Sequence, residues 1–392
     1  MRVKLRHIAL NLALAAGSVL ATLAFLELVV FGVILKPDDV LPNVSIDNVV
    51  RYKPGTHAVF RHPDGSETLA TINADGWNST KPDYPRARTP GVLRVAVIGD
   101  SYVHGSFVNV GEGFPEVIER RLKSAGVRAE VLRFGMDGAP MSQYLHMLRR
   151  EVRAFQPDIV VVLLIHNDFD ESYRFLKTRY TSSFLKLAID ESGAVTELPP
   201  ADFTPGPADL LREFATFRYL YYKTNAYLQL KWMVSRLWWG GSEEYAPEFI
   251  SSAVDIRNLA DARRNRLAAR YVLAEMRALA ESDGFRLAVA MDGVREAVYA
   301  GKAPDAYEVG KLNIIAREVT AELGLPFLDL QEIFAADYAR AHERFEFSYD
   351  WHWNARANRL VGSAIARLLL TDPRLAVEPP ERNAAQAPGP KG

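Results

Sequence analysis

The chain has 392 residues, of which 48% are hydrophobic and 24% are charged, and its formal net charge is −1. This composition is typical of a globular protein with a sizeable core, and the charge balance lacks the basic excess expected of a nucleic-acid-binding protein. The absence of cysteine excludes disulfides, thiolate metal sites and cysteine nucleophiles.

The N-terminal segment 1–37 has the pattern of a membrane anchor. Arg2, Lys4 and Arg6 precede an apolar run, in which Ile8–Leu26 alone is 19 residues long. About 20 apolar residues cross a bilayer as a helix. A basic flank stays in the cytoplasm, so we predict a single-pass inner (cytoplasmic) membrane protein whose main domain is periplasmic or otherwise extracytoplasmic.

A cleaved signal peptide is the alternative interpretation of this segment. The one evident small-residue cleavage pattern, Ala13-Leu14-Ala15, comes early, and apolar residues continue long past it. We therefore favour an uncleaved anchor over a signal peptide.

A lead-in rich in Pro, Gly, Asp and Asn covers 38–91, and a regular pattern starts at Val92. Short apolar runs then alternate with segments of helical periodicity up to residue 371. This alternation predicts an α/β domain with a doubly wound parallel sheet, a flavodoxin-like three-layer sandwich behind the transmembrane helix. We expect strands at Leu93–Ile98, Ala129–Phe134, Ile159–Ile165, Phe285–Met291 and Pro326–Leu330, and helices at Glu112–Ala125, Gln143–Phe155, Ile256–Ser282, Ala306–Leu323 and Ala355–Leu370.

Two segments depart from this rhythm. Residues 172–255 are expected to be a helical insertion, aromatic-rich over Leu211–Gly240. Aromatic side chains there could stack on sugars or sit at a membrane interface, although the buried face of a cap helix is the interpretation we favour. Residues 372–392 contain several prolines and no apolar periodicity, which predicts a disordered tail.

Small and polar residues follow three of the expected strands: Gly99-Asp100-Ser101, Gly135, and His166-Asn167-Asp168. The carboxyl ends of parallel strands meet at one edge of the sheet, where ligands bind. A serine there, at a helix N-terminus, is well placed as a nucleophile. It could equally be a simple N-cap.

A nucleophilic serine needs a base, and the base needs a group that fixes its tautomer. The segment Asp350-Trp351-His352-Trp353-Asn354 provides both types of residue. Asp350 and His352 point to the same side of an extended loop, so we predict that His352 is the base. The alternative is a chance polar pair on a loop.

These four blocks, in this order, resemble those of the SGNH (GDSL-like) hydrolases. The Asp-x-His-Trp-Asn form resembles the membrane-anchored branch concerned with polysaccharide O-acetylation and deacetylation. The resemblance implies a nucleophile at Ser101, a base at His352 and an orienting acid at Asp350. It also implies an oxyanion hole formed by the backbone N–H groups of Ser101 and Gly135 and the side-chain amide of Asn167.

Three departures from the family pattern stand out. Phe134 occupies the place where Asn usually precedes the glycine of the second block, and Ile165 replaces a usual glycine in the third block. Asp350 lies two residues before His352 instead of the more usual three, which makes its role less secure than that of His352.

The resemblance implies an ester hydrolase that acts through an acyl-serine on acyl, in particular acetyl, esters of carbohydrate. An O-acyltransferase that modifies an exported or envelope polysaccharide is one alternative, and a non-catalytic polysaccharide-binding scaffold is another. His166, Asp168, Asp170 and His352 could be read as metal ligands, but the serine chemistry needs none. We expect no metal, cofactor or nucleic-acid partner.

Overall fold

A computed structural model describes residues 2–105, 107–174, 183–201, 203–220 and 261–376 of the chain. The chain divides into two compact units, which are treated separately. The smaller unit comprises Met1–Pro42, Ala58–Glu67 and Thr204–Glu248, and the larger comprises Asn43–His57, Thr68–Phe203 and Phe249–Gly392.

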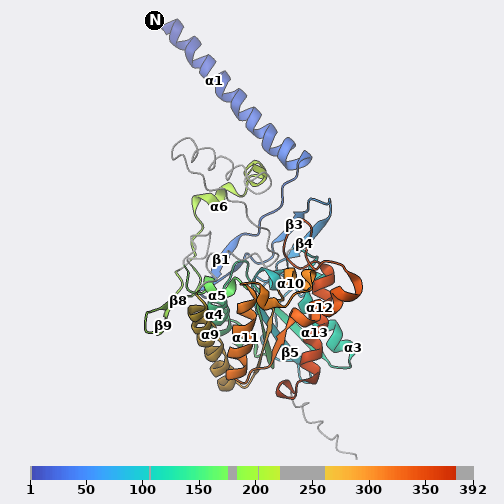
Figure 1. The fold of residues 1–392 in the computed structure, drawn as a ribbon. Helices are drawn as coiled ribbons and strands as arrows, with labels where there is room; N and C mark the ends of the chain where they lie inside the picture. Colours follow the sequence, from blue (N-terminus) through green and yellow to red (C-terminus); the bar gives the residue numbers. More distant parts are fainter. Residues whose placement is uncertain (1, 106, 175–182, 202, 221–260, 377–392) are drawn as a thin grey trace, which may run out of the picture. The chain divides into compact units, whose positions relative to one another are not determined.

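A five-stranded parallel sheet forms the centre of the larger unit (Figure 1). Its strand order is β11-β10-β7-β5-β6. Numbered along the chain within this sheet, the order is 2-1-3-4-5, which is the flavodoxin-like arrangement. The predicted fold class is therefore confirmed. The strands are β5 (Leu93–Gly99), β6 (Ala129–Gly135), β7 (Ile159–Leu164), β10 (Arg286–Met291) and β11 (Phe327–Asp329).

Helices cover both faces of this sheet, which makes three layers (Figure 1). Val95, Val97 and Val161 face a core that includes Phe114, while the opposite faces of the strands are also buried. Near-continuous apolar strands are typical of parallel sheets buried on both faces. The helices are α2 (Ser101–His104), α3 (Phe114–Ser124), α4 (Met141–Arg150), α5 (Asp168–Glu171), α9 (Ala262–Asp283), α10 (Arg295–Ala300), α11 (Gly310–Glu322), α12 (Leu330–Ala341) and α13 (Ala355–Thr371), with 3₁₀ turns η2 (Val110–Glu112), η3 (Val152–Phe155), η7 (Pro304–Ala306) and η8 (Pro373–Leu375).

The structure differs from the predicted elements in several places. The helix expected at Gln143–Phe155 is two elements, α4 and η3, separated at Glu151. The Glu151 carboxylate is buried, where it accepts hydrogen bonds from Arg51 at 2.5 Å and from the Trp77 indole at 3.1 Å. The helix α12 was not predicted.

The predicted insertion lies partly outside the described residues, as do the start of the helix expected at Ile256 and most of the predicted tail. Within the described part, the insertion contains an antiparallel hairpin of β8 (Lys186–Ile189) and β9 (Val195–Leu198), so an entirely helical insertion is wrong. The tail prediction also fails at its start, since Leu375 in η8 is buried. The aromatic run beyond residue 220 falls outside the described residues.

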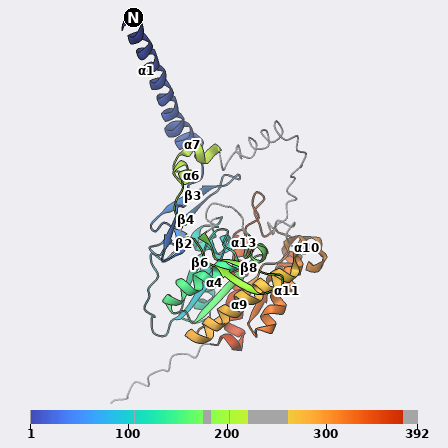
Figure 2. The same ribbon diagram turned by 90° about the vertical axis from the view of Figure 1, so that its left-hand side faces the viewer.

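The smaller unit begins with α1 (Arg2–Phe25), which continues as the π-helical η1 (Leu26–Ile34). The window Arg6–Ile34, 29 residues with a mean hydropathy of 2.2, is long and apolar enough to cross a membrane, a property that signal sequences share. Figure 2 shows α6 (Pro207–Leu211) and α7 (Ala215–Arg218) at the end of this helix.

The short strands of the lead-in are β1 (Asn43–Ile46), β2 (Val49–Tyr52), β3 (His57–Arg61) and β4 (Glu67–Thr71).

The contact between α3 and α13 depends on Gly362. A Cβ built at this position would lie 2.6 Å from Val117 Cβ and 2.7 Å from the Phe114 carbonyl oxygen. Real Cβ atoms do not approach other atoms this closely, so the two helices could pack at this distance only with glycine here.

We therefore expect Gly362→Ala to destabilise the fold by about 1–3 kcal/mol, the cost of overpacking a core. The matched control is Gly111→Ala, because a Cβ at Gly111 has no atom within 4 Å. Thermal unfolding of both variants tests the prediction. Equal melting temperatures would show that α3 and α13 are not packed as described.

Candidate active site

Ser101 lies at the carboxyl edge of the sheet, directly after β5. The Asp100 side chain, not that of Ser101, caps α2: its Oδ1 accepts the Tyr102 N–H at 3.0 Å. The alternative reading of Ser101 as an N-cap therefore does not hold. Ser101 is the first residue of α2, so its hydroxyl is not used for capping. Its backbone N–H lies at the positive end of the helix dipole.

His352 and Asp350 lie on the loop between α12 and α13, and this loop brings them to Ser101. His352 Nε2 is 2.8 Å from Ser101 Oγ, and His352 Nδ1 is 2.6 Å from Asp350 Oδ1. Asp350 Oδ1 also accepts the His352 backbone N–H at 2.7 Å. A neutral His352 with its proton on Nδ1 can thus donate to Asp350 and accept from Ser101. The expected proximity of Ser101 and His352, 251 residues apart, is confirmed.

Arg295, on α10, joins the nucleophile segment to the histidine loop. Its Nη1 donates to the Trp351 carbonyl at 2.6 Å, and its Nη2 donates to the Tyr102 hydroxyl at 2.8 Å. The Tyr102 hydroxyl donates in turn to the same Trp351 carbonyl at 3.1 Å. Arg295 is fully buried, and the buried carboxylates of Asp292 and Glu346 lie 3.4 and 3.5 Å from it. The residues next to Ser101 and next to His352 are therefore tied to one buried charge.

Aromatic rings surround the imidazole. Phe107 stacks on His352 with a centroid distance of 4.5 Å and an interplanar angle of 11°. The exposed Trp351 ring lies 5.9 Å from the imidazole at 27°. The Trp353 indole is buried and donates to Asp292 at 3.2 Å. The stacked Phe107 ring restricts the imidazole to the orientation in which Nε2 faces Ser101.

Gly135 pairs with Gly99 in the parallel register of β5 and β6. A Cβ at Gly135 would lie 2.1 Å from the His104 backbone nitrogen, so glycine is needed for α2 to pass over the end of β6. Asn167 follows β7, and its amide Nδ2 donates to Glu171 Oε2 at 3.2 Å. Both residues lie at the carboxyl edge of the sheet. Their predicted role in an oxyanion hole stays a prediction.

The same edge holds buried acids to which the sequence analysis assigned no part in the serine chemistry. Burial raises the pKa of Asp100 to about 7. Burial, helped by the charge of Asp100, raises the pKa of Asp168 well above its usual value. Asp168 accepts hydrogen bonds from the Tyr144 hydroxyl at 2.8 Å and from the Ile165 N–H at 2.7 Å. Strand-end acids in a sequence could have signalled this cluster, but their burial could not be foreseen.

The residues considered as metal ligands have other partners. His166 Nε2 lies 2.8 Å from Asn313 Oδ1, and Asp170 pairs with Arg174. Within the described ranges, no group of three or more His, Asp or Glu side chains could hold a metal ion.

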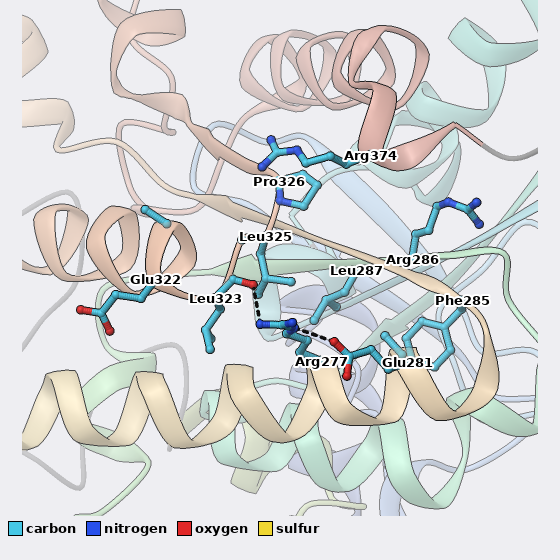
Figure 3. Close-up of a pocket in the computed structure, with 13 residues that line it drawn as sticks. Arg277, Glu281, Phe285, Arg286, Leu287, Glu322, Leu323, Leu325, Pro326 and Arg374 are labelled. Carbon is cyan, nitrogen blue, oxygen red and sulfur yellow. Dashed lines mark hydrogen bonds and ion pairs between the residues drawn. The ribbon is translucent and has the colours of Figure 1, made fainter.

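A hollow of about 450 Å³ lies at the opposite edge of the sheet, where β10 begins (Figure 3). Arg277 on its wall donates to the Leu323 carbonyl at 3.0 Å and to Glu281 at 2.8 Å. The hollow is lined by residues at the amino end of β10, such as Arg286 and Leu287. Ser101, by contrast, follows the carboxyl end of a parallel strand. This hollow is therefore separate from the candidate site.

A Ser–His–Asp chain of hydrogen bonds at the edge of an α/β sheet is the arrangement found in serine hydrolases. Residues 95–213 match the family described as GDSL-like Lipase/Acylhydrolase. This part of the chain is therefore similar to the GDSL-like lipases and acylhydrolases, a family of ester-hydrolysing enzymes, as the sequence motifs indicated. The match includes Ser101, Gly135 and Asn167 and ends before the loop with His352.

Among solved structures, the chain is similar to the acetyl xylan esterase AlAXEase, with 13% identity over 70% of this chain and 98% of that chain and a TM-score of 0.38. It is similar to a catalytic mutant of Axe2, an acetylxylan esterase from Geobacillus stearothermophilus, with 12% identity over 72% of this chain and 96% of that chain and a TM-score of 0.39. It is also similar to a lipase/acylhydrolase from Enterococcus faecalis, with 14% identity over 71% of this chain and 95% of that chain and a TM-score of 0.36. A search of curated proteins finds no match.

Glu171 gives the site a testable pH dependence. Burial raises its pKa from 4.5 to about 7. Between about pH 4.5 and pH 7, Glu171 is therefore protonated in the native protein and ionised in the unfolded chain. Its contribution to the free energy of unfolding is fully present below about pH 4.5 and is lost as the pH rises to about 7. Glu171→Gln should stabilise the protein at pH 8 by on the order of 1–3 kcal/mol, and not at pH 4.

Urea unfolding at both pH values measures this difference. The control is Glu332→Gln, since Glu332 is exposed on α12. A stability change for Glu171→Gln that is the same at pH 4 and pH 8 would contradict the raised pKa.

Proposed function

We propose that the protein hydrolyses acyl esters of carbohydrate through an acyl-serine formed at Ser101. The observation that carries this proposal is the chain of hydrogen bonds from Asp350 through His352 to Ser101, at 2.6 and 2.8 Å. The family match supports the coarser conclusion, ester hydrolysis.

In the first half-reaction, His352 Nε2 takes the hydroxyl proton as Ser101 Oγ bonds to the ester carbonyl carbon. Asp350 stabilises the resulting imidazolium and fixes its orientation. The tetrahedral oxyanion accepts hydrogen bonds from the N–H groups of Ser101 and Gly135 and from the Asn167 amide. Collapse expels the alkoxide, which takes the proton from His352. Water, deprotonated by His352, then releases the acid and restores Ser101.

The surroundings of Ser101 support a short acyl group. A small, partly enclosed hollow lined by Ser101, Phe107, Val108 and His352, among others, has a volume of about 10 Å³. That is room for about one water-sized group, which a methyl approximates. An acetyl ester suits this space, and longer chains would have to displace Phe107 from the imidazole.

The exposed Trp351 supports a carbohydrate on the alcohol side. Its side chain is 39% exposed beside His352, while its carbonyl is fixed by Arg295 and Tyr102. An exposed indole face next to the base is suited to stack on a sugar ring. The anchor belongs to the proposal: the apolar stretch Arg6–Ile34 is long enough to cross a membrane, and the basic residues before it favour an orientation with the enzyme on the periplasmic side, where exported polysaccharide is found.

Ser101→Ala and His352→Ala should each abolish turnover of p-nitrophenyl acetate, because the two residues act as one unit. Asp350→Ala should lower kcat about 10²–10⁴-fold, and Asn167→Ala about 10²–10³-fold through the oxyanion hole. Because Asp100 caps α2, the melting temperature of Ser101→Ala should equal that of the wild type.

Wild-type turnover in Ser101→Ala would contradict the proposal and favour a carbohydrate-binding scaffold on the same fold. Acyl transfer to an added oligosaccharide, faster than release to water, would instead identify an O-acyltransferase that uses the same residues.

Trp351→Ala should raise KM for an acetylated polysaccharide about tenfold, an amount within the usual worth of an aromatic contact. It should leave kcat/KM for p-nitrophenyl acetate within a factor of about two, since the backbone carbonyl that Arg295 binds is retained. Trp351→Phe is the matched control and should recover most of the affinity. An equal loss on both substrates would show that Trp351 acts on the histidine loop and not on the sugar.

A further inference from the structure

The apolar N-terminal helix carries one carboxylate near its end, and a second segment of the smaller unit binds it. Glu27 accepts the backbone N–H groups of Ala215 at 2.6 Å and of Thr216 at 2.9 Å. A carboxylate on an otherwise apolar helix is costly in or near lipid unless its oxygens are paired. The first N–H groups of α7 provide this pairing, so α7 is fastened to the helix at this level.

Further contacts hold the same segment in place. The Phe31 and Tyr219 rings lie 5.2 Å apart. The Arg218 guanidinium donates to the carbonyls of Arg212 at 3.2 Å and Glu213 at 3.0 Å, which closes the turn between α6 and α7. Residues 207–220, which we name the collar, are therefore attached to the end of the N-terminal helix, where Figure 2 shows α6 and α7.

The collar exposes large apolar side chains. Leu210 and Phe214 are 68% and 53% exposed, and Leu211 and Leu220 are exposed as well. Four exposed large apolar side chains within 11 residues of sequence are unusual for a water-facing surface, and such clusters mark interaction sites.

The length of the helix indicates where the collar lies relative to a bilayer. The 29 residues of Arg6–Ile34 extend roughly 44 Å at about 1.5 Å per residue, more than the ~30 Å hydrocarbon core. A span of about 20 residues that begins after Arg6 ends near Leu26. Glu27 and the collar bound to it then lie at the outer interface.

We propose that the collar is a membrane-interface element whose Leu210, Leu211, Phe214 and Leu220 side chains insert into the outer leaflet around the anchor. The proposal rests on the proposed membrane anchor and adds a second lipid contact to it. The helix to which the collar is bound is itself apolar at this level, where Leu28 is 68% exposed. Glu27 is paired with α7, so the junction between the two surfaces leaves no unpaired carboxylate in lipid.

The absence of cysteine from the chain permits a direct test on the full-length protein. Single variants Leu210→Cys and Phe214→Cys carry a nitroxide label, and the protein is reconstituted in phosphatidylcholine/phosphatidylglycerol vesicles. Electron paramagnetic resonance then compares accessibility to oxygen, which concentrates in lipid, with accessibility to a water-soluble nickel chelate. Leu20→Cys, inside the span and 66% exposed, is the lipid control, and Leu28→Cys, next to Glu27, is the helix control at the level of the collar. Leu370→Cys, on α13 in the larger unit and 46% exposed, is the water control.

We expect labels at 210 and 214 to show an oxygen-to-nickel accessibility ratio several times that of Leu370→Cys and close to that of Leu28→Cys. Nickel accessibility equal to the water control would overturn the proposal. Low accessibility to both reagents would also overturn it, because protein would then cover the collar. A water-like label at Leu20→Cys would show that the anchor itself is wrong, which separates that failure from a failure of the collar alone.

Discussion

The geometry of the candidate site depends on one buried cation, Arg295. Ser101 and His352 lie on different elements, and no backbone hydrogen bond can set the distance between two such side chains. Arg295 sets it by binding the Tyr102 hydroxyl and the Trp351 carbonyl at once, with Tyr102 closing the triangle. A buried guanidinium is tolerated only when its charge is paired. Asp292 and Glu346 provide this pairing, so the polar core of the site is held as a single network.

Sheet topology determines why these particular segments meet. In the order β11-β10-β7-β5-β6, the strand that follows β5 in the chain lies on one side of it and the later strands lie on the other. The strand order therefore reverses between β5 and β7, and ligands bind at such a switch point, beyond the carboxyl ends of the strands. Ser101 follows β5 and Asn167 follows β7. Gly135, opposite Gly99, leaves room for α2 to cross the end of β6. The smaller unit adds an apolar helix to this enzyme domain, and Glu27 ties the collar to that helix.

The strands and most helices were predictable because continuous apolar runs and helical periodicity depend on local sequence. Ser101, His352 and Asp350 were found because strand-end position and spacing carry a chemical meaning. Arg295 was not found, since nothing in the sequence around it tells a buried arginine from a surface one. The break of the predicted helix at Glu151 was missed for a similar reason: its cause is a contact with Arg51, a hundred residues away. Sequence patterns therefore do not reveal which buried charges, far apart in the chain, pair with one another.

The central claim is that His352 activates Ser101 as the nucleophile, and covalent trapping tests it most directly. A p-nitrophenyl alkylphosphonate forms a stable adduct with an activated serine in a geometry close to the tetrahedral intermediate. Peptide mass spectrometry of the treated protein should find the phosphonyl group on Ser101, and His352→Ala should slow labelling by orders of magnitude. Labelling of a different residue, or labelling of Ser101 at the same rate without His352, would contradict the account.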